Sequence, residues 1–160
     1  MMQIEIQTVG DQNFIRRFNR YIEDMRDFTE PFNRIYDDFV EVEKNIFGSE
    51  GAPERFVQLS DRYKEWKERF FPGLPIMQLH RRLVTSLISR NDSDAIVDID
   101  GRGGVATFGT KIPYAHRHQM GTFGMKQRKF IQLTEEIKRR WAKIIQEWAF
   151  EQGHKAMGVQ

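Results

Sequence analysis

The stretch "DAIVDIDGRGGVATFGT", residues 94–110, contains two short runs with strand character on either side of four turn-forming residues. Ile96 and Ile99 are apolar residues of the first run, "DAIVDID". The segment "GRGG" at 101–104 is typical of a hairpin turn, and "VATFGT" is typical of the returning strand. The stretch therefore predicts an antiparallel hairpin, which makes an all-helical fold untenable for this chain.

A long helical segment precedes the hairpin. Its apolar residues recur in alternating steps of four and three, which indicates one continuous buried stripe along a helix. They are Phe14, Phe18, Tyr21, Met25, Phe28, Phe32, Ile35, Phe39, Val42 and Ile46. Pro31 lies inside this register and must kink or split the helix. We expect Thr29 to cap a second helix that holds Pro31 in its first turn.

Shorter elements flank this helical segment and the hairpin. Alternating residues predict a strand at Met2–Val9, and Asp11 is the expected cap of the helix that follows. Ser60 is the expected cap of a helix at 61–70. The segment "MQLHRRLVTSL" (77–87) predicts a helix that runs into another strand near "SLISR" (86–90). The sheet would then contain three or four strands.

The last third of the chain predicts two helices. Pro113 opens a short helical turn that extends to Met120, and Thr134 is the expected cap of the helix at 135–150. The apolar face of this last helix contains Ile137, Trp141, Ile144, Ile145 and Trp148. The order strand, kinked helical segment, small antiparallel sheet and C-terminal helix predicts a single α+β domain over residues 1–160.

Composition excludes several classes of protein. The 160 residues include no cysteine, which removes disulfides, thiolate metal sites and cysteine nucleophiles, and is consistent with a reducing cytoplasm. No run approaches the ~20 apolar residues of a membrane span, and we expect no signal peptide. The formal net charge of +2 is too small to indicate nucleic-acid binding. The sequence also lacks both common glycine-rich phosphate loops.

The stretch "FGTKIPYAHRHQMGT", residues 108–122, is the best candidate for a chemical site. His116 and His118 could begin a metal or acid–base site, or they could belong to a turn between a strand and a helix. In a helix after Pro113 the two imidazoles lie about 200° apart and diverge. No carboxylate nearby completes a ligand set, and no serine has a nucleophile-elbow context. We therefore expect no catalytic residue, metal site or cofactor.

The same stretch, followed by "RKFIQL" (128–133), resembles the phage virion morphogenesis family, the tail-completion proteins of Mu-like and related tailed phages. The residues that match the family's motif are Gly109, Thr110, Tyr114, His118, Gln119, Gly121, Arg128 and Phe130. Upstream, "LSDRYKEWK" (59–67) and "PIMQLHRRLVTSL" (75–87) look like two further family segments. The resemblance covers residues from about Phe56 to Trp148.

The resemblance implies a non-enzymatic virion protein. Such a protein acts as a tail-completion or tail-terminator ring, expected to be a hexamer, at the head-proximal end of the tail tube, and it is needed for head–tail joining. Its implied partners are further copies of itself, the tail tube protein and head-completion or connector proteins. Genomic DNA would only pass through the lumen, and no membrane is involved. The implied location is the tail or neck of the virion, after assembly in the bacterial host cytoplasm.

The resemblance also implies that the histidine-containing stretch, residues 108–122, is a structural scaffold. Tyr114 and His118, four residues apart on a helix, can stack and offer their polar tips to neighbouring backbone. Gly109 and Gly121 would supply permissive backbone dihedrals at the two ends of the turn.

Charge is distributed unevenly along the chain. Acids outnumber bases from Glu23 to Glu43, whereas His116–Lys143 is mainly basic, so copies could attract one another head to tail. Lys138, Arg139 and Arg140 are the candidate ring interface; the alternative is that both regions are simply solvated helix faces. The residues leave open the ring stoichiometry, the tail type, and a head-completion or connector ring as the function. A metal-dependent or DNA-binding module is a third hypothesis.

Overall fold

The computed structural model describes residues 12–122 and 124–157. The predicted strand at Met2–Val9 and the predicted cap Asp11 lie outside this range, and both stay predictions. Within the range, helices surround one antiparallel hairpin, which confirms the α+β class. In chain order the elements are α1 (Gln12–Asp24), α2 (Thr29–Gly48), α3 (Asp61–Phe70), α4 (Arg82–Ile88), β1 (Ala95–Asp100), β2 (Val105–Thr110), α5 (Pro113–Met120) and α6 (Glu135–Met157).

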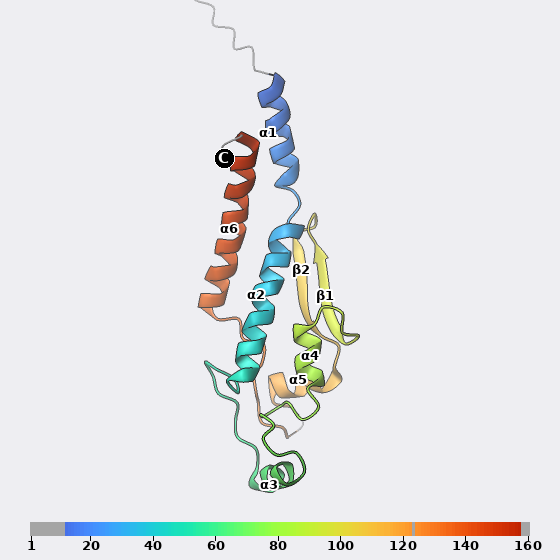
Figure 1. Ribbon diagram of the computed structural model, residues 1–160. Coiled ribbons are helices and arrows are strands. Elements are labelled where there is room, and N and C mark those ends of the chain that lie inside the picture. The colour runs from blue at the N-terminus through green and yellow to red at the C-terminus, as the bar shows by residue number, and fades with distance from the viewer. Residues whose placement is uncertain (1–11, 123, 158–160) are drawn as a thin grey trace, which may run out of the picture.

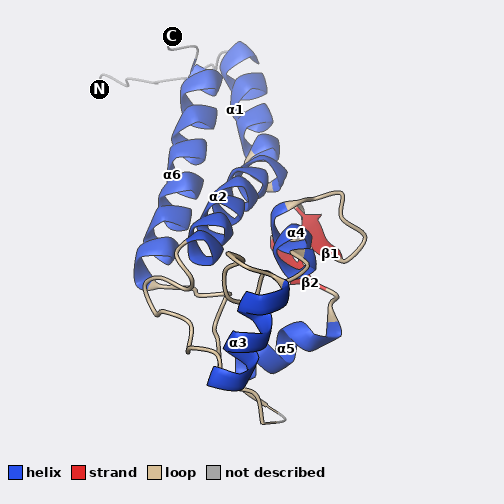
Figure 2. Ribbon diagram, turned by 60° about the horizontal axis from the view of Figure 1, so that its bottom comes forward, coloured by secondary structure: helices blue, strands red, loops and turns tan. Residues whose placement is uncertain are grey.

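The molecule is elongated. Figure 1 shows α1 and the C-terminal end of α6 at one end, α3 at the other, and α2 between them beside the hairpin. The elements fall into two groups in Figure 2: helices α6, α1 and α2 lie together on one side, and helices α3 and α5 lie together at the opposite end. Helix α2 is therefore the element that links the two ends.

The predicted hairpin is confirmed. Strands β1 and β2 pair antiparallel, with Ala95 opposite Thr110 and Asp100 opposite Val105. The strand predicted near residues 86–90 is wrong, because α4 continues to Ile88 and the described residues form a sheet of two strands only. Leu83 and Leu87, four residues apart, are both buried, and this helical spacing lets α4 pack against α2 and β2.

The predicted start of this helix at Met77 is also wrong. Met77 and Arg81 have φ values of +65° and +54°, in the left-handed region that interrupts an α-helix, so α4 begins only at Arg82. The preceding segment bonds to the end of α2 instead. The buried Gln78 side chain donates from Nε2 to the Phe47 carbonyl at 2.7 Å. These tertiary bonds outweigh the local helical pattern.

The break near Pro31 is confirmed, although its cap differs from the prediction. Helix α2 begins at Thr29 with Pro31 in its first turn. Phe28, rather than Thr29, occupies the N-cap position without a side-chain capping bond, and Asp27 Oδ1 accepts the Thr29 N–H at 2.9 Å. Hydrogen bonds from the side chain and backbone of Thr29 hold the pKa of Asp27 below its usual value.

The apolar stripe is buried in α2 but not in α1. Ile35, Phe39 and Ile46 belong to the core, whereas Phe18 is 50% exposed. The prediction of one continuous buried stripe is therefore wrong for the first helix. Helix α1 packs against α6 and extends past the hairpin, so it lies beyond the elements that would cover its apolar side.

Aromatic side chains fill the core around α2. Phe39 lies 5.6 Å from Phe108 of β2, measured between ring centroids, and Phe47 lies 6.0 Å from Phe56 and from Phe130. Helix α6 closes the other side of α2. Its predicted cap is confirmed, since Thr134 Oγ1 accepts the Ile137 N–H at 3.3 Å.

Candidate functional site

Residues 108–122, the best candidate for a chemical site in the sequence, include the link from β2 to α5. Thr110 ends β2, and its hydroxyl accepts the Ile112 N–H at 3.2 Å. The same hydroxyl lies 2.8 Å from Ser86 Oγ, which itself donates to the Leu83 carbonyl, so Thr110 is the donor to Ser86. Because Ser86 is buried in α4, this chain of bonds fastens the end of the hairpin to α4.

The two predicted glycine roles have opposite outcomes. Gly121 ends α5 with φ = +70°, and an added Cβ would lie 2.8 Å from Gln127 Cβ, so glycine is required there. Gly109 lies inside β2 opposite Ile96, without a positive φ, and an added Cβ would meet nothing within 4 Å. The prediction of a permissive dihedral at Gly109 is therefore wrong.

Tyr114 and His118 contact each other on α5, but not in the predicted stacked arrangement. Their ring centroids are 6.1 Å apart and the rings meet edge to face at 89°. Burial lowers the pKa of the half-buried His118, and the Arg128 charge lowers it further, so the imidazole is neutral near pH 7. His118 Nδ1 is buried without a hydrogen-bond partner in the described part of the chain, so the prediction that the polar tip of His118 bonds to neighbouring backbone is wrong at this atom.

Gln119 uses both ends of its amide on the backbone that follows α5. Its Oε1 accepts the N–H groups of Phe130 and Ile131 at 3.0 and 3.2 Å, and its Nε2 donates to the Ile131 carbonyl at 2.8 Å. The residue therefore supplies hydrogen bonds that a regular strand partner would otherwise give.

Arg128 fastens the same segment to a third part of the chain. Its backbone N–H donates to the His118 carbonyl at 2.8 Å, and its guanidinium donates to the carbonyls of Val57 and Gln58 at 2.7 and 3.2 Å. Phe130, only 2% exposed, then inserts beside Phe47. His118, Gln119, Gly121, Arg128 and Phe130 together are called the clasp below.

The clasp contains no metal centre. Over residues 12–122 and 124–157, no group of three or more histidine, aspartate or glutamate side chains is placed to hold a metal ion. No helix in that range is long and apolar enough to cross a membrane. The side chains of Gln119 and Arg128 bond to backbone groups, so the arrangement holds three chain segments together.

The predicted ring-interface residues are largely engaged within the chain. Lys138 Nζ pairs with Glu135 at 2.7 Å, and Arg140 Nε lies 2.7 Å from Asp38 Oδ1, at an angle that suits an ion pair better than a hydrogen bond. Arg139 is exposed and forms no ion pair with another described residue. The basic α6 and the acidic α2 thus meet inside one molecule, and a role for these residues between copies stays a prediction.

Sequence reasoning did not identify an exposed aromatic surface on α3. Tyr63, Trp66 and Phe70 are 42%, 41% and 57% exposed, and we call them the aromatic face. Tyr63 stacks on Trp66 with centroids 5.4 Å apart, and Phe70 lies 5.8 Å from Trp66. Their spacing of three and four residues was the available signal, but such spacing usually indicates burial.

A cleft of about 240 Å³ lies beside this helix, lined by residues of α3, the segment 76–83, α5 and Arg128. We call it the basic cleft because its lining includes Lys67, His80, Arg81, Arg82, His118 and Arg128. Its lining, all of it within the described part of the chain, contains no carboxylate. Sequence analysis missed the cleft because these residues come from four separate segments.

Comparison of the chain with protein-family models, curated proteins and solved structures finds no match.

Proposed function

We propose that the chain is a structural virion protein of a tailed phage, a tail-completion ring subunit at the head-proximal end of the tail tube that is needed for head–tail joining. The observation that carries this proposal is the clasp. Five of the eight motif residues that resemble the virion morphogenesis family, spread over thirteen positions, converge on one fastening point.

The chemistry of the clasp supports a role in architecture. A catalytic or ligand-binding site needs polar side chains that are free to reach a substrate. Gln119 and Arg128 instead donate to, or accept from, main-chain groups, and Phe130 fills the core. Under this proposal the protein is not an enzyme and uses no cofactor.

The aromatic face supports a protein partner. Exposed aromatic clusters commonly mark interfaces, where Trp and Tyr supply much of the binding energy. In the proposed ring, such surfaces would meet further copies, the tail tube protein or the head-completion and connector proteins. DNA would pass through the lumen without specific contacts, and the protein would reside in the neck of the virion after assembly in the host cytoplasm.

A head-completion or connector ring of the same neck is the second candidate. The aromatic face suits either layer equally, because both layers bind a protein ring above and below. The layer occupied in an intact particle separates the two candidates.

The test is to image phage particles that lack the chain and particles that carry a tagged copy. The proposal predicts that loss of the chain leaves filled heads and unattached tails, and that the tag lies where the tail tube meets the head. A tag in the head-side layer would favour the connector alternative. Normal particles without the chain would contradict both.

A further inference from the structure

Strand β2 has one edge without a strand partner. The described residues form a sheet of two strands, so β2 pairs with β1 on one side only. The Lys111 N–H donates to the Asp94 carbonyl at 2.7 Å, and bonded and non-bonded pairs alternate along an antiparallel ladder. Ala106 and Phe108 therefore direct their backbone N–H and C=O groups away from β1. No backbone bond joins these groups to a third segment in the described part of the chain.

An apolar hollow of about 190 Å³ lies on the same side of β2. Its lining includes Ala106, Phe108 and residues of α2 and α6, but no residue of β1. Leu133, which also lines the hollow, is 52% exposed. Glu43 is the one ionisable residue of the lining, and burial raises its pKa to about 8, so the carboxyl is neutral near pH 7. The volume is below the ~300–1,000 Å³ of sites for drug-sized ligands and suits aliphatic side chains.

The free edge and the hollow together fit an extended peptide. A strand that pairs with β2 would bond to the outward N–H and C=O groups of Ala106 and Phe108. Its alternate side chains would point to the same face of the sheet as those two residues, and so into the hollow. The occupant should therefore be a strand with apolar residues at every second position.

The chain itself contains such a segment at residues 2–9. Ile4 and Ile6 alternate there with Gln3, Glu5 and Gln7. This alternation predicts a strand with one apolar and one polar face. The segment lies outside the described residues, so its strand is a prediction from sequence.

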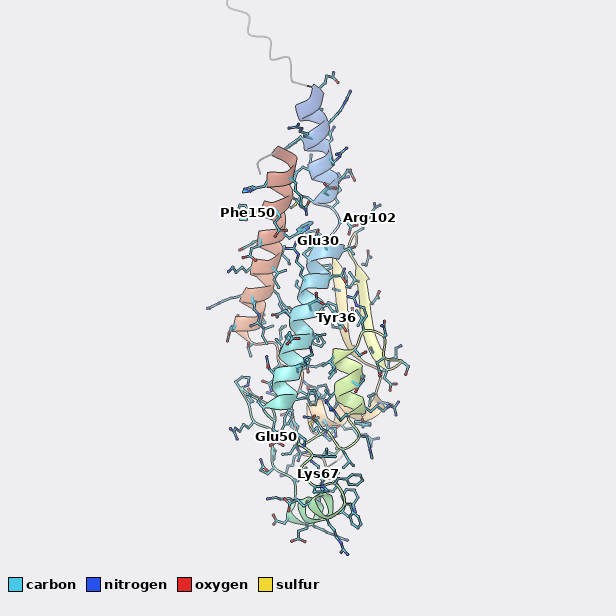
Figure 3. All side chains as sticks on the ribbon, in the orientation of Figure 1. Glu30, Tyr36, Glu50, Lys67, Arg102 and Phe150 are labelled. Carbon is cyan, nitrogen blue, oxygen red and sulfur yellow. The ribbon has the colours of Figure 1, made fainter. Side chains whose placement is uncertain are left out.

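Residues 2–9 are too far from β2 of their own chain to pair with it. Figure 3 labels Arg102 of the hairpin turn near Glu30 at the start of α2, and α1 extends beyond both. The thirteen residues of α1 make it about 20 Å long, and Gln12 begins it at the far end. From Gln12 back to Val9 the chain spans only about 10 Å. A strand at residues 2–9 can therefore pair with β2 only in another copy.

We propose that residues 2–9 of one copy add a third strand to the free edge of β2 in a second copy, with Ile4 and Ile6 in the apolar hollow. The proposal rests on the proposed function, because it names a contact between subunits of the ring. The donor and acceptor surfaces differ, so one-way donation produces a closed ring when the rotation between copies closes and a filament when it does not.

The first test mixes single-cysteine variants of the full chain that carry tags of different length. The chain has no cysteine of its own, so every disulfide in a mixture joins two copies. Thr107→Cys, at an exposed position on the sheet face opposite the hollow, is combined in turn with three donor variants: Gln3→Cys, Glu5→Cys and Gln7→Cys. In the proposed pairing these donor side chains lie on the same face as Thr107. Mild oxidation should convert most of the protein in at least one mixture into a disulfide-linked heterodimer.

Asp98→Cys is the matched control for the acceptor. Asp98 is exposed and lies opposite Thr107, one strand further from the free edge of β2. It would be about 10 Å from the added strand, beyond the ~7 Å that a disulfide can bridge. Cross-linking of Asp98→Cys that equals or exceeds that of Thr107→Cys would overturn the proposal, as would no cross-link in all three mixtures. If Thr107→Cys fails to fold by circular dichroism, Val105→Cys, at a position 58% exposed on the same strand, takes its place.

The second test measures self-association by sedimentation velocity. Ile4→Asp combined with Ile6→Asp would place charge in the apolar hollow and should weaken association at least about tenfold. Gln3→Asp combined with Gln7→Asp adds the same charge to the opposite face and should change affinity by less than about threefold. Equal losses in the two double variants, or a wild type that stays monomeric, would contradict strand donation.

The outcomes separate this proposal from the proposed function. A neck that contains a ring of this chain, without the cross-link to Thr107→Cys, would overturn the strand pairing and leave the function in place. Cross-linking of the purified protein, with normal particles in the absence of the chain, would support the strand pairing and contradict the function.

Discussion

The clasp and the aromatic face lie at the same end of the molecule, yet their side chains differ in burial and in bonding. In the clasp, Gln119 has backbone partners for both ends of its amide and Phe130 is buried against Phe47. In the aromatic face, three large rings stack mainly on one another and stay in contact with solvent. The clasp residues have their partners within the described part of the chain, whereas the rings of the aromatic face stay between 41% and 57% exposed.

The same contrast holds for buried ionisable groups. Glu43 in α2 is almost fully buried, and burial raises its pKa to about 8. Its Oε2 has no hydrogen-bond partner in the described part, so the carboxyl is stable there mainly as the neutral acid. Lys67 and Arg128 line an open cleft and can gain a counterion from outside. Burial disfavours the charged form in both places and lowers the pKa of Lys67 and of Arg128, but the cleft is open to ions from solvent.

The largest effect should come from truncating a core ring. Phe39→Ala should lower the free energy of unfolding by about 3–5 kcal/mol, because it leaves a cavity beside Phe108. Phe70→Ala in the aromatic face should cost less than about 1 kcal/mol, because that ring is exposed. Urea denaturation of both variants measures the difference in free energy of unfolding. Equal losses would contradict the distinction between a buried core ring and an exposed ring.

The next effect should depend on pH and concern Glu43. Its folded pKa of about 8 exceeds the ordinary 4.5, so the folded state binds the extra proton between these values. The contribution of Glu43 to stability is therefore full below about pH 4.5 and declines as pH rises toward 8, at up to about 1.4 kcal/mol per pH unit. Glu43→Gln should remove much of this decline. Parallel pH profiles for the two proteins would show that Glu43 is not buried as described.

Removing the clasp amide should have an intermediate effect. Gln119→Ala leaves the Phe130 and Ile131 N–H groups without their acceptor and should cost about 1–3 kcal/mol. Gln127→Ala is the matched control, because its exposed side chain makes a single bond to the Gln119 carbonyl. We expect the control to lose less than about 0.5 kcal/mol in thermal melts. A control as damaging as Gln119→Ala would refute the clasp.

The smallest effect should distinguish two helix caps. Thr134→Ala removes the bond from the Ile137 N–H and should cost about 1 kcal/mol. Ser60 occupies the same position before α3 but makes no side-chain capping bond, so Ser60→Ala should be near neutral. Denaturant titrations of the pair test whether α3 is the less tightly held helix, and a larger loss at Ser60 would reverse that ranking.

Local patterns were sufficient for much of the fold. The hairpin at 95–110, the split at Pro31, the α5 boundaries Pro113–Met120 and the Thr134 cap were all predictable, because each depends on neighbouring residues. The start of α4 was not, since Gln78 and its neighbours bond to residues about thirty positions away. The exposure of α1 also depends on where other elements end.

The candidate site divides in the same way. The motif residues of the clasp were identifiable by resemblance, and the Tyr114–His118 contact followed from a four-residue spacing. The dihedral predicted for Gly109 was wrong because the residue type alone does not show that the backbone there is extended within β2. The basic cleft could not be found, because Lys67, Arg81, His118 and Arg128 meet only through tertiary packing. The ion pair between Arg140 and Asp38 was hidden for the same reason.

The most direct test of the account is to measure folding and assembly in one variant of the aromatic face, Trp66→Ala. We expect its free energy of unfolding, measured on dilute monomer, to stay within about 1 kcal/mol of wild type, because Trp66 is exposed. Light scattering at higher concentration should show a multimer for wild type and a monomer for Trp66→Ala. A variant that assembles like wild type, or one as unstable as Phe39→Ala, would contradict the proposal that a partner protein covers this face.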